Sequence, residues 1–156
     1  MGRVYSVSFA GVAISAVQDL IGIYNGANMA TRLHGVVIGQ ITGTTVQNLK
    51  VSVHRLAATV TPGSSGTTAT PQKMNRGDPS SVISSAHIND TTQATSAGNA
   101  LLHADIYNTV NGFQFFWPPD TRPIAGLSEA FILSLDTAPT GGAMTMSGTL
   151  YFEELF

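Results

Sequence analysis

The chain has 156 residues, with 7 Lys and Arg against 9 Asp and Glu and a formal net charge of -2 when the histidines are neutral. This length is typical of one domain, and we predict a single domain over residues 1–156. Charged residues form 10% of the chain, whereas soluble domains carry roughly 25%. Such a composition excludes binders whose affinity comes from clustered charges.

Uncharged residues must therefore cover the surface, and Thr, Ser and Gly together occupy 48 positions. The five arginines and two lysines are spread along the chain, so we expect no nucleic-acid partner and no membrane partner, because both are bound through clustered cations. Cysteine is absent, which excludes disulfides and thiolate metal sites. Residues 1–7 lack the pattern of an export signal, and no apolar run reaches about 18 residues.

Period-two alternation predicts the first element of the chain. Tyr5, Val7 and Phe9 share one apolar face, which predicts a strand with that face buried. Residues 10–30 are ambiguous, because apolar residues at helical spacing are interrupted by glycines. This segment is expected to hold at most a two-turn helix.

The next two elements are predicted as strands, followed by a long irregular segment. Residues 31–42 are apolar on both faces, which predicts a central strand covered on two sides. A hairpin turn at residues 43–45 leads to residues 46–56, where alternation predicts one buried face. Residues 59–81 are rich in Pro and Gly, which predicts a long surface loop or interaction arm that a neighbouring subunit orders.

The C-terminal half is dominated by strand patterns. Residues 82–88 predict a strand, and residues 99–108 fit either a strand or a short helix. Residues 131–135 and 144–153 alternate clearly, which predicts two strands with one apolar face each. With roughly seven to nine short strands, the chain is predicted to be an all-β protein, an antiparallel β-sandwich that is jelly-roll-like rather than immunoglobulin-like.

The chemistry-bearing residues match no catalytic or metal-binding template. His34, His54, His87 and His103 are isolated in sequence and lack the spacing of metal ligands, which favours roles on strand faces or at interfaces. No Gly-x-Ser-x-Gly turn and no glycine-rich phosphate loop occurs. We therefore predict no catalytic residue, no metal and no cofactor, and the chain is not expected to be an enzyme.

An aromatic run precedes two prolines and predicts an interface. In a strand that contains Phe115, Phe116 and Trp117, alternation places at least one large aromatic on the face opposite the core. A chain this poor in charge is typical of proteins that cover surface by assembly. These three residues are our predicted oligomer interface, with Trp117 as a cap on the sandwich core as the alternative.

Scattered sequence pieces carry a resemblance that covers nearly the whole chain. The pieces are Gln18-Asp19-Leu20, Arg32-Leu33-His34, Gly39-Gln40, Asn89-Asp90-Thr91-Thr92, Trp117-Pro118-Pro119 and the Gly148-Thr149-Leu150-Tyr151-Phe152-Glu153-Glu154 segment. Taken together, they resemble small proteins encoded among phage and prophage virion genes, and among them a jelly-roll decoration (cement) protein of tailed-phage capsids. The resemblance implies a homotrimer that binds the major capsid protein on the outer surface of the virion, after synthesis in the host cytoplasm.

Capsid contact is assigned to the first strand and to the irregular segment, because an exposed edge or a loop ordered on binding can pair with a neighbour. The residues chosen are Arg3, Tyr5, Gly63 and Arg76.

The alternative function is a carbohydrate-binding, lectin-like module or the receptor-binding head of a phage fibre or spike. In that case Trp117 would stack on a sugar ring beside Asp120 and Gln114. Exposure of the aromatic side chain discriminates the two functions, because a lectin keeps it open in the free protein.

Overall fold

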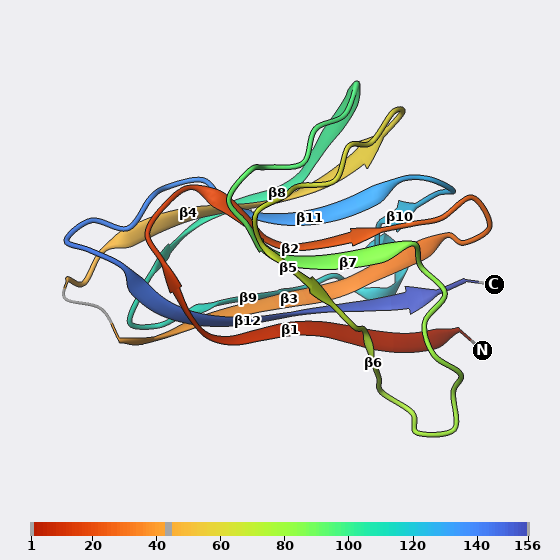
Figure 1. The fold of residues 1–156 in the computed structure, drawn as a ribbon. Coiled ribbons are helices and arrows are strands. Elements are labelled where there is room, and N and C mark those ends of the chain that lie inside the picture. Colours follow the sequence, from red (N-terminus) through yellow and green to blue (C-terminus); the bar gives the residue numbers. More distant parts are fainter. Residues whose placement is uncertain (1, 43–44, 156) are drawn as a thin grey trace.

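Two antiparallel sheets packed face to face form the protein (Figure 1). The structure, a computed structural model, describes residues 2–42 and 45–155. The prediction of an all-β antiparallel sandwich is confirmed. Most of the predicted turn at residues 43–45 lies outside the described residues.

Each sheet contains six strands in the described part of the chain. Sheet A has the order β10 (Ile124–Ala125), β3 (Thr31–Thr42), β12 (Met144–Glu154), β1 (Arg3–Ile14) and β6 (Gln72–Lys73), with β9 (Phe113–Phe116) also paired to β3. Sheet B has the order β5 (Thr67–Ala69), β7 (Ser85–Asp90), β2 (Gln18–Tyr24), β11 (Ala130–Leu135), β4 (Asn48–Ala57) and β8 (Gly98–Asn108). A short 3-10 turn spans Pro119–Thr121.

The chain alternates between the sheets in a regular way. Strands β1, β2, β3 and β4 lie in sheets A, B, A and B, and strands β8, β9, β11 and β12 lie in sheets B, A, B and A. The short strands β5, β6 and β7 fall between these two halves, where β7 extends sheet B beside β2 and β6 extends sheet A beside β1.

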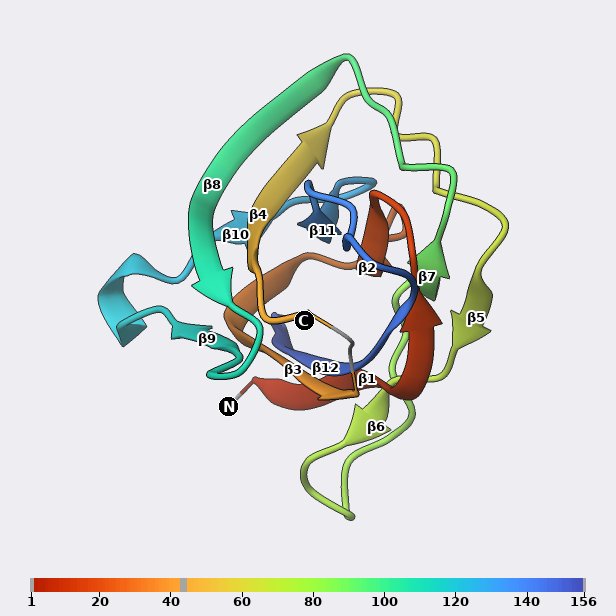
Figure 2. The same ribbon diagram turned by 90° about the vertical axis from the view of Figure 1, so that its left-hand side faces the viewer.

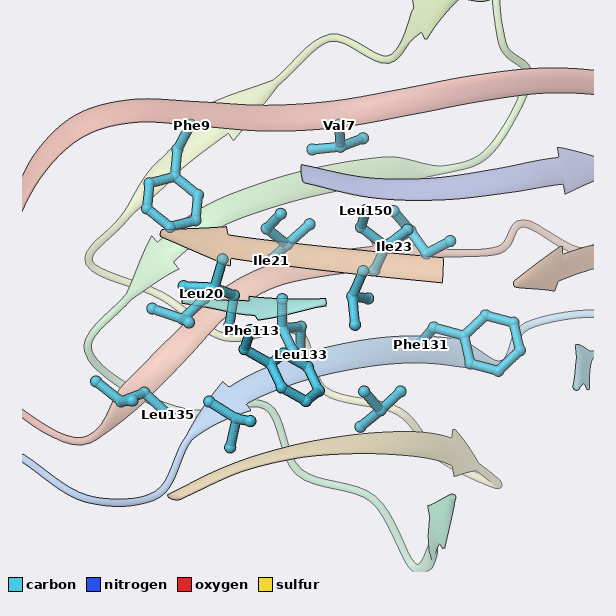
Figure 3. Close-up of a cluster of buried hydrophobic side chains, with 14 of the residues drawn as sticks. Val7, Phe9, Leu20, Ile21, Ile23, Phe113, Phe131, Leu133, Leu135 and Leu150 are labelled. Carbon is cyan, nitrogen blue, oxygen red and sulfur yellow. The ribbon is translucent and has the colours of Figure 1, made fainter. Parts of the chain in front are cut away.

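The core fills the space between the sheets. On β1, Tyr5, Val7 and Phe9 are buried as predicted, and on β12 every second residue from Met144 to Glu154 is buried. Figure 3 shows side chains of both sheets meeting in this space, among them Val7, Phe9 and Leu150 from sheet A and Ile21 and Leu133 from sheet B. Period-two alternation therefore defines the buried face of these two strands of sheet A.

Residues 10–30, which were ambiguous in the sequence, contain strands and no helix. β1 continues to Ile14, and β2 follows at Gln18–Tyr24. The glycine that interrupts the pattern, Gly11, has a φ of +65° in a bulge that shifts the register with β12 between Phe9 and Val12. All seven residues of β2 are buried. A strand covered on both faces has no period-two pattern, which explains the ambiguity of the sequence.

Two strands differ from the prediction in how their outer faces are covered. β3 is central, but its outer face is not covered, because His34 and Val37 on that face are only partly buried and the Ile41 side chain is 65% exposed. β11 was expected to bury one face and instead buries both. On its outer side, Ala130 and Ile132 pack with Tyr24 and Leu56 in a second apolar cluster. Val60 and Ala94, from the connection between β4 and β8, pack against this cluster, which explains the difference.

The segment at residues 59–81 is mostly irregular and exposed, and short pairings within this chain anchor it. Thr61 and Ser64 form isolated bridges with Thr95 and Thr92. β5 then pairs with β7, and β6 pairs with β1. These pairings join residues far apart in sequence, so local composition could not reveal them.

The absence of a side chain at Gly66 is expected to be essential for the close packing of this segment. A Cβ added there would collide with the carbonyl oxygen of Ile88 and lie 2.5 Å from Oδ1 of Asp90. We expect Gly66→Ala to lower the free energy of unfolding in urea by about 1–3 kcal/mol, the usual cost of overpacking. The control is Gly39→Ala, because an added Cβ at Gly39 meets no atom within 4 Å. Equal unfolding curves for the two variants would contradict this placement.

Candidate functional site

The aromatic run is split between the core and the surface. Phe113 is buried, and the indole of Trp117 is buried at 9% exposure, whereas Phe116 is 51% exposed. The Trp117 ring meets Phe115 edge-on at 4.7 Å between centroids, and His103 stacks on Phe115 at 3.9 Å. Trp117 therefore caps the core, which was the alternative prediction.

The burial of Trp117 corrects two assignments. The indole is not open for stacking on a sugar, and it is not open for contact with another subunit. Gln114 and Asp120, the other proposed sugar contacts, are exposed without an aromatic platform from Trp117 beside them. Of the predicted interface, Phe116 keeps an accessible ring. It lies 5.9 Å from the ring of Tyr151.

The outer face of sheet A is lined by hydroxyl groups, and we call it the hydroxyl face. Ser8 and Thr149 share a hydrogen bond of 2.8 Å, and Ser147 accepts one of 3.0 Å from the backbone of Gly11. The strand registers place on this face Val4, Ser6, Ser8, Arg32, His34, Val37, Gln114, Phe116, Thr145, Ser147, Thr149, Tyr151 and Glu153. The alternation of Ser and Thr with apolar residues was visible in the sequence, but it was not interpreted as a surface.

Charge on the hydroxyl face is confined to one cluster in the described part of the chain. Arg32 Nη1 lies 3.3 Å from Oε2 of Glu153, and His34 Nε2 lies 3.1 Å from the same oxygen. Because the Arg32 and Glu153 charges neutralise each other, the rest of the face offers hydroxyls and apolar groups. A surface of this kind suits a protein contact better than a charged ligand.

The four predicted capsid contacts fall into two groups. Arg3 and Arg76 are exposed, whereas Tyr5 and Gly63 are buried. The Tyr5 ring stacks on Phe152 at 5.6 Å, and its hydroxyl donates to the carbonyl of Pro79 at 3.1 Å. Tyr5 and Gly63 are therefore structural residues, and the assignment of these two as surface contacts was wrong.

The connection between β6 and β7, residues 74–84, forms an arm. Figures 1 and 2 show it extending past the outer side of sheet A, near the N-terminus. Its start is fixed where the backbone of Met74 donates to Val4 at 3.0 Å. Its return is fixed by Glu154, whose Oε1 accepts from Ser81 Oγ at 2.6 Å and from the backbone of Val82 at 2.7 Å. Arg76 and Met74 are exposed on this arm.

The buried carboxylates on sheet B were not predicted from the sequence. Asp19 is 3% exposed and accepts hydrogen bonds from the backbone of Ala94 and from Ser134 Oγ, each at 2.7 Å, and from Gln93 Nε2 at 3.2 Å. Burial raises the pKa of Asp19, and these three bonds oppose the rise. An aspartate inside an apolar run was the signal that could have revealed this position.

A second set of contacts ties the same region together. Asp90 accepts from the backbone of Gly66 at 3.1 Å and contacts His87 Nδ1 at 3.0 Å. Tyr24 accepts from the backbone of Gly63 at 3.1 Å, and burial raises the pKa of Tyr24 to about 12. These groups hold the long connection between β4 and β8 on the sandwich.

Comparisons with protein-family models, curated proteins and solved structures returned no match. Within residues 2–42 and 45–155, no group of three or more His, Cys, Asp or Glu side chains is arranged to hold a metal ion. No helix in the same residues is long and apolar enough to cross a membrane.

Proposed function

We propose that this chain is a structural virion protein that decorates a phage capsid and stabilises it by binding across capsid subunits. In this proposal the sandwich is a jelly roll with an insertion between its fourth and fifth long strands. Support comes from the strand order, because β1-β12-β3-β9 and β2-β11-β4-β8 is the order of two interleaved four-stranded Greek keys. Jelly rolls occur in viral capsid proteins and also in lectins, so the surface must decide between functions.

The observation that carries the proposal is the placement of two exposed features at opposite edges of sheet A. Phe116 lies on β9 at one edge, and the arm leaves β6 at the other. The rest of the hydroxyl face lies between Phe116 and the arm. We assign Phe116 to a homotrimer contact and the arm, with Arg3 and Arg76, to the major capsid protein. Because the edges are separate, both contacts can form at once.

Such a protein acts through binding energy alone. Contacts that favour the assembled shell stabilise it by mass action, and their effect is summed over many copies. The proposal needs no catalytic residue and no cofactor. It places the protein on the outer capsid surface of the virion, after synthesis in the host cytoplasm.

The test is co-sedimentation with shells built from the major capsid protein without this protein. We expect light scattering to give the mass of a trimer and the trimer to pellet with shells to saturation. Arg76→Ala is expected to weaken shell binding by at least about tenfold, because a buried interface arginine contributes strongly. Lys50→Ala is the control, since it removes an exposed cation from sheet B. A monomer that stays in the supernatant at every concentration would refute the proposal.

A further inference from the structure

A pocket of about 260 Å³ opens on sheet B, away from the hydroxyl face. Most of its lining is polar and comes from Asp19, His54, Gln93, Asn99, Ser134 and Asp136. Leu56 of β4 and Ile132 of β11, each 2% exposed, add a small apolar floor. Polar groups that converge on one hollow are suited to orient a small polar ligand.

The polar groups of this pocket are fixed before any ligand arrives. Asn99 Oδ1 lies 2.7 Å from Nδ1 of His54, whose Nε2 lies 2.8 Å from Ser52 Oγ. Ser52 Oγ also lies 3.0 Å from Oδ1 of Asp136, and its single proton serves one of these two neighbours at a time. These contacts restrict the side chains of Asn99 and Asp136. Gln93 is held through its Nε2, which donates to Asp19. Little ordering of side chains is then needed on binding.

Both a donor and an acceptor remain available at the pocket. Within the described residues, Asn99 Nδ2 and Gln93 Oε1 have no hydrogen-bond partner, while the opposite atom of each amide is bonded. Asp136 Oδ2 adds an acceptor, with Lys50 Nζ at 3.8 Å. Groups that donate and accept side by side match hydroxyls, which do both.

Charged ligands fit this pocket poorly. Two carboxylates, Asp19 and Asp136, disfavour an anion. A cation is disfavoured because both oxygens of Asp19 already accept hydrogen bonds from the protein and the Lys50 ammonium lies 3.8 Å from Oδ2 of Asp136. The remaining class is a neutral ligand with hydroxyls on its edge and an apolar face, and the pocket volume suits one ring rather than a chain.

We propose that this pocket binds a single neutral sugar ring, with its hydroxyls on Asn99, Gln93 and Asp136 and its C–H face on Leu56 and Ile132. This inference goes beyond the proposed function and uses the sheet opposite to the one assigned to the capsid. A chain attached to a shell through sheet A would present the pocket outward. The site is also distinct from the sugar contact that the sequence suggested beside Trp117.

The test uses the free protein, so it does not depend on shells. Methyl glycosides of glucose, galactose, mannose and N-acetylglucosamine are titrated while ¹H-¹⁵N spectra are recorded. At least one is expected to shift the side-chain amides of Gln93 and Asn99 saturably, with a dissociation constant of about 1 mM for a ligand of this size. Asn99→Ala is expected to weaken binding by at least about tenfold, because it removes the free donor.

Two further variants keep the test decisive. Gln93→Ala removes the free acceptor while Asp19 keeps its bonds to Ala94 and Ser134, and it should weaken binding similarly. Gln114→Ala removes an exposed amide from sheet A and should bind as the unmodified chain does. The proposal is overturned if no glycoside shifts the pocket, if the shifts map to Gln114, or if calcium or ammonium shifts the pocket and the glycosides do not.

Discussion

Replacing Asp19 with alanine is expected to lower the free energy of unfolding by about 2–4 kcal/mol. The substitution leaves the Ser134 hydroxyl and the backbone N–H of Ala94 without their acceptor, and unpaired buried donors are costly. Urea denaturation measures this loss. Hydrogen exchange should also quicken around residues 92–97, because Asp19 ties this segment to β2.

The pH dependence of this loss follows from the direction of the pKa shift. Burial raises the pKa of Asp19 above its ordinary value of 3.8. At a pH between this ordinary value and the raised pKa of the folded chain, Asp19 holds a proton in the folded chain and has released it in the unfolded chain. The contribution of Asp19 to stability therefore grows as the pH falls through this range. Asp19→Ala lacks this contribution, so the difference from the unmodified chain should widen on acidification.

The matched control is Asp120→Ala, which removes an exposed carboxylate from the 3-10 turn. It should unfold within about 0.5 kcal/mol of the unmodified chain at every pH, as surface substitutions usually do. A difference for Asp19→Ala that narrows toward acid would contradict the raised pKa, because it would show that the hydrogen bonds to the carboxylate outweigh its burial.

Strands with one buried face and one open face were predictable because each follows one rule. On β1 and β12, one face meets the core and the other meets solvent, so alternation alone defines them. β2 was missed because both of its faces are covered. Asp19 in that strand is satisfied by Ala94 and Ser134, which lie 75 and 115 residues further along the chain. No local pattern reports such partners.

The residues of the candidate surfaces, like the strands, were predicted correctly in part. Alternation correctly required an aromatic on the outer side of sheet A, and Phe116 occupies that place. It could not determine that Trp117, one residue beyond β9, turns into the core. Alternation on β1 already predicted the burial of Tyr5, so its assignment to a capsid contact conflicted with the pattern of its own strand. The burial of Gly63 involves Tyr24, which lies elsewhere in the sequence. Residues are assigned to a surface reliably only when their own strand decides their burial.

Trp117→Ala and Phe116→Ala are expected to separate folding from assembly. Trp117 packs in the core, so its removal should lower the free energy of unfolding by about 3–5 kcal/mol in urea denaturation followed by circular dichroism.

Phe116 is half exposed, so its removal should lower the free energy of unfolding by less than about 1 kcal/mol, while light scattering shows the trimer dissociating to monomers. Leu101→Ala is the control for Phe116, since it removes an exposed apolar side chain from sheet B. If Phe116→Ala remained a trimer as stable as the unmodified protein, the interface would have to lie elsewhere, because a ring at the centre of a subunit contact cannot be removed without loss of affinity.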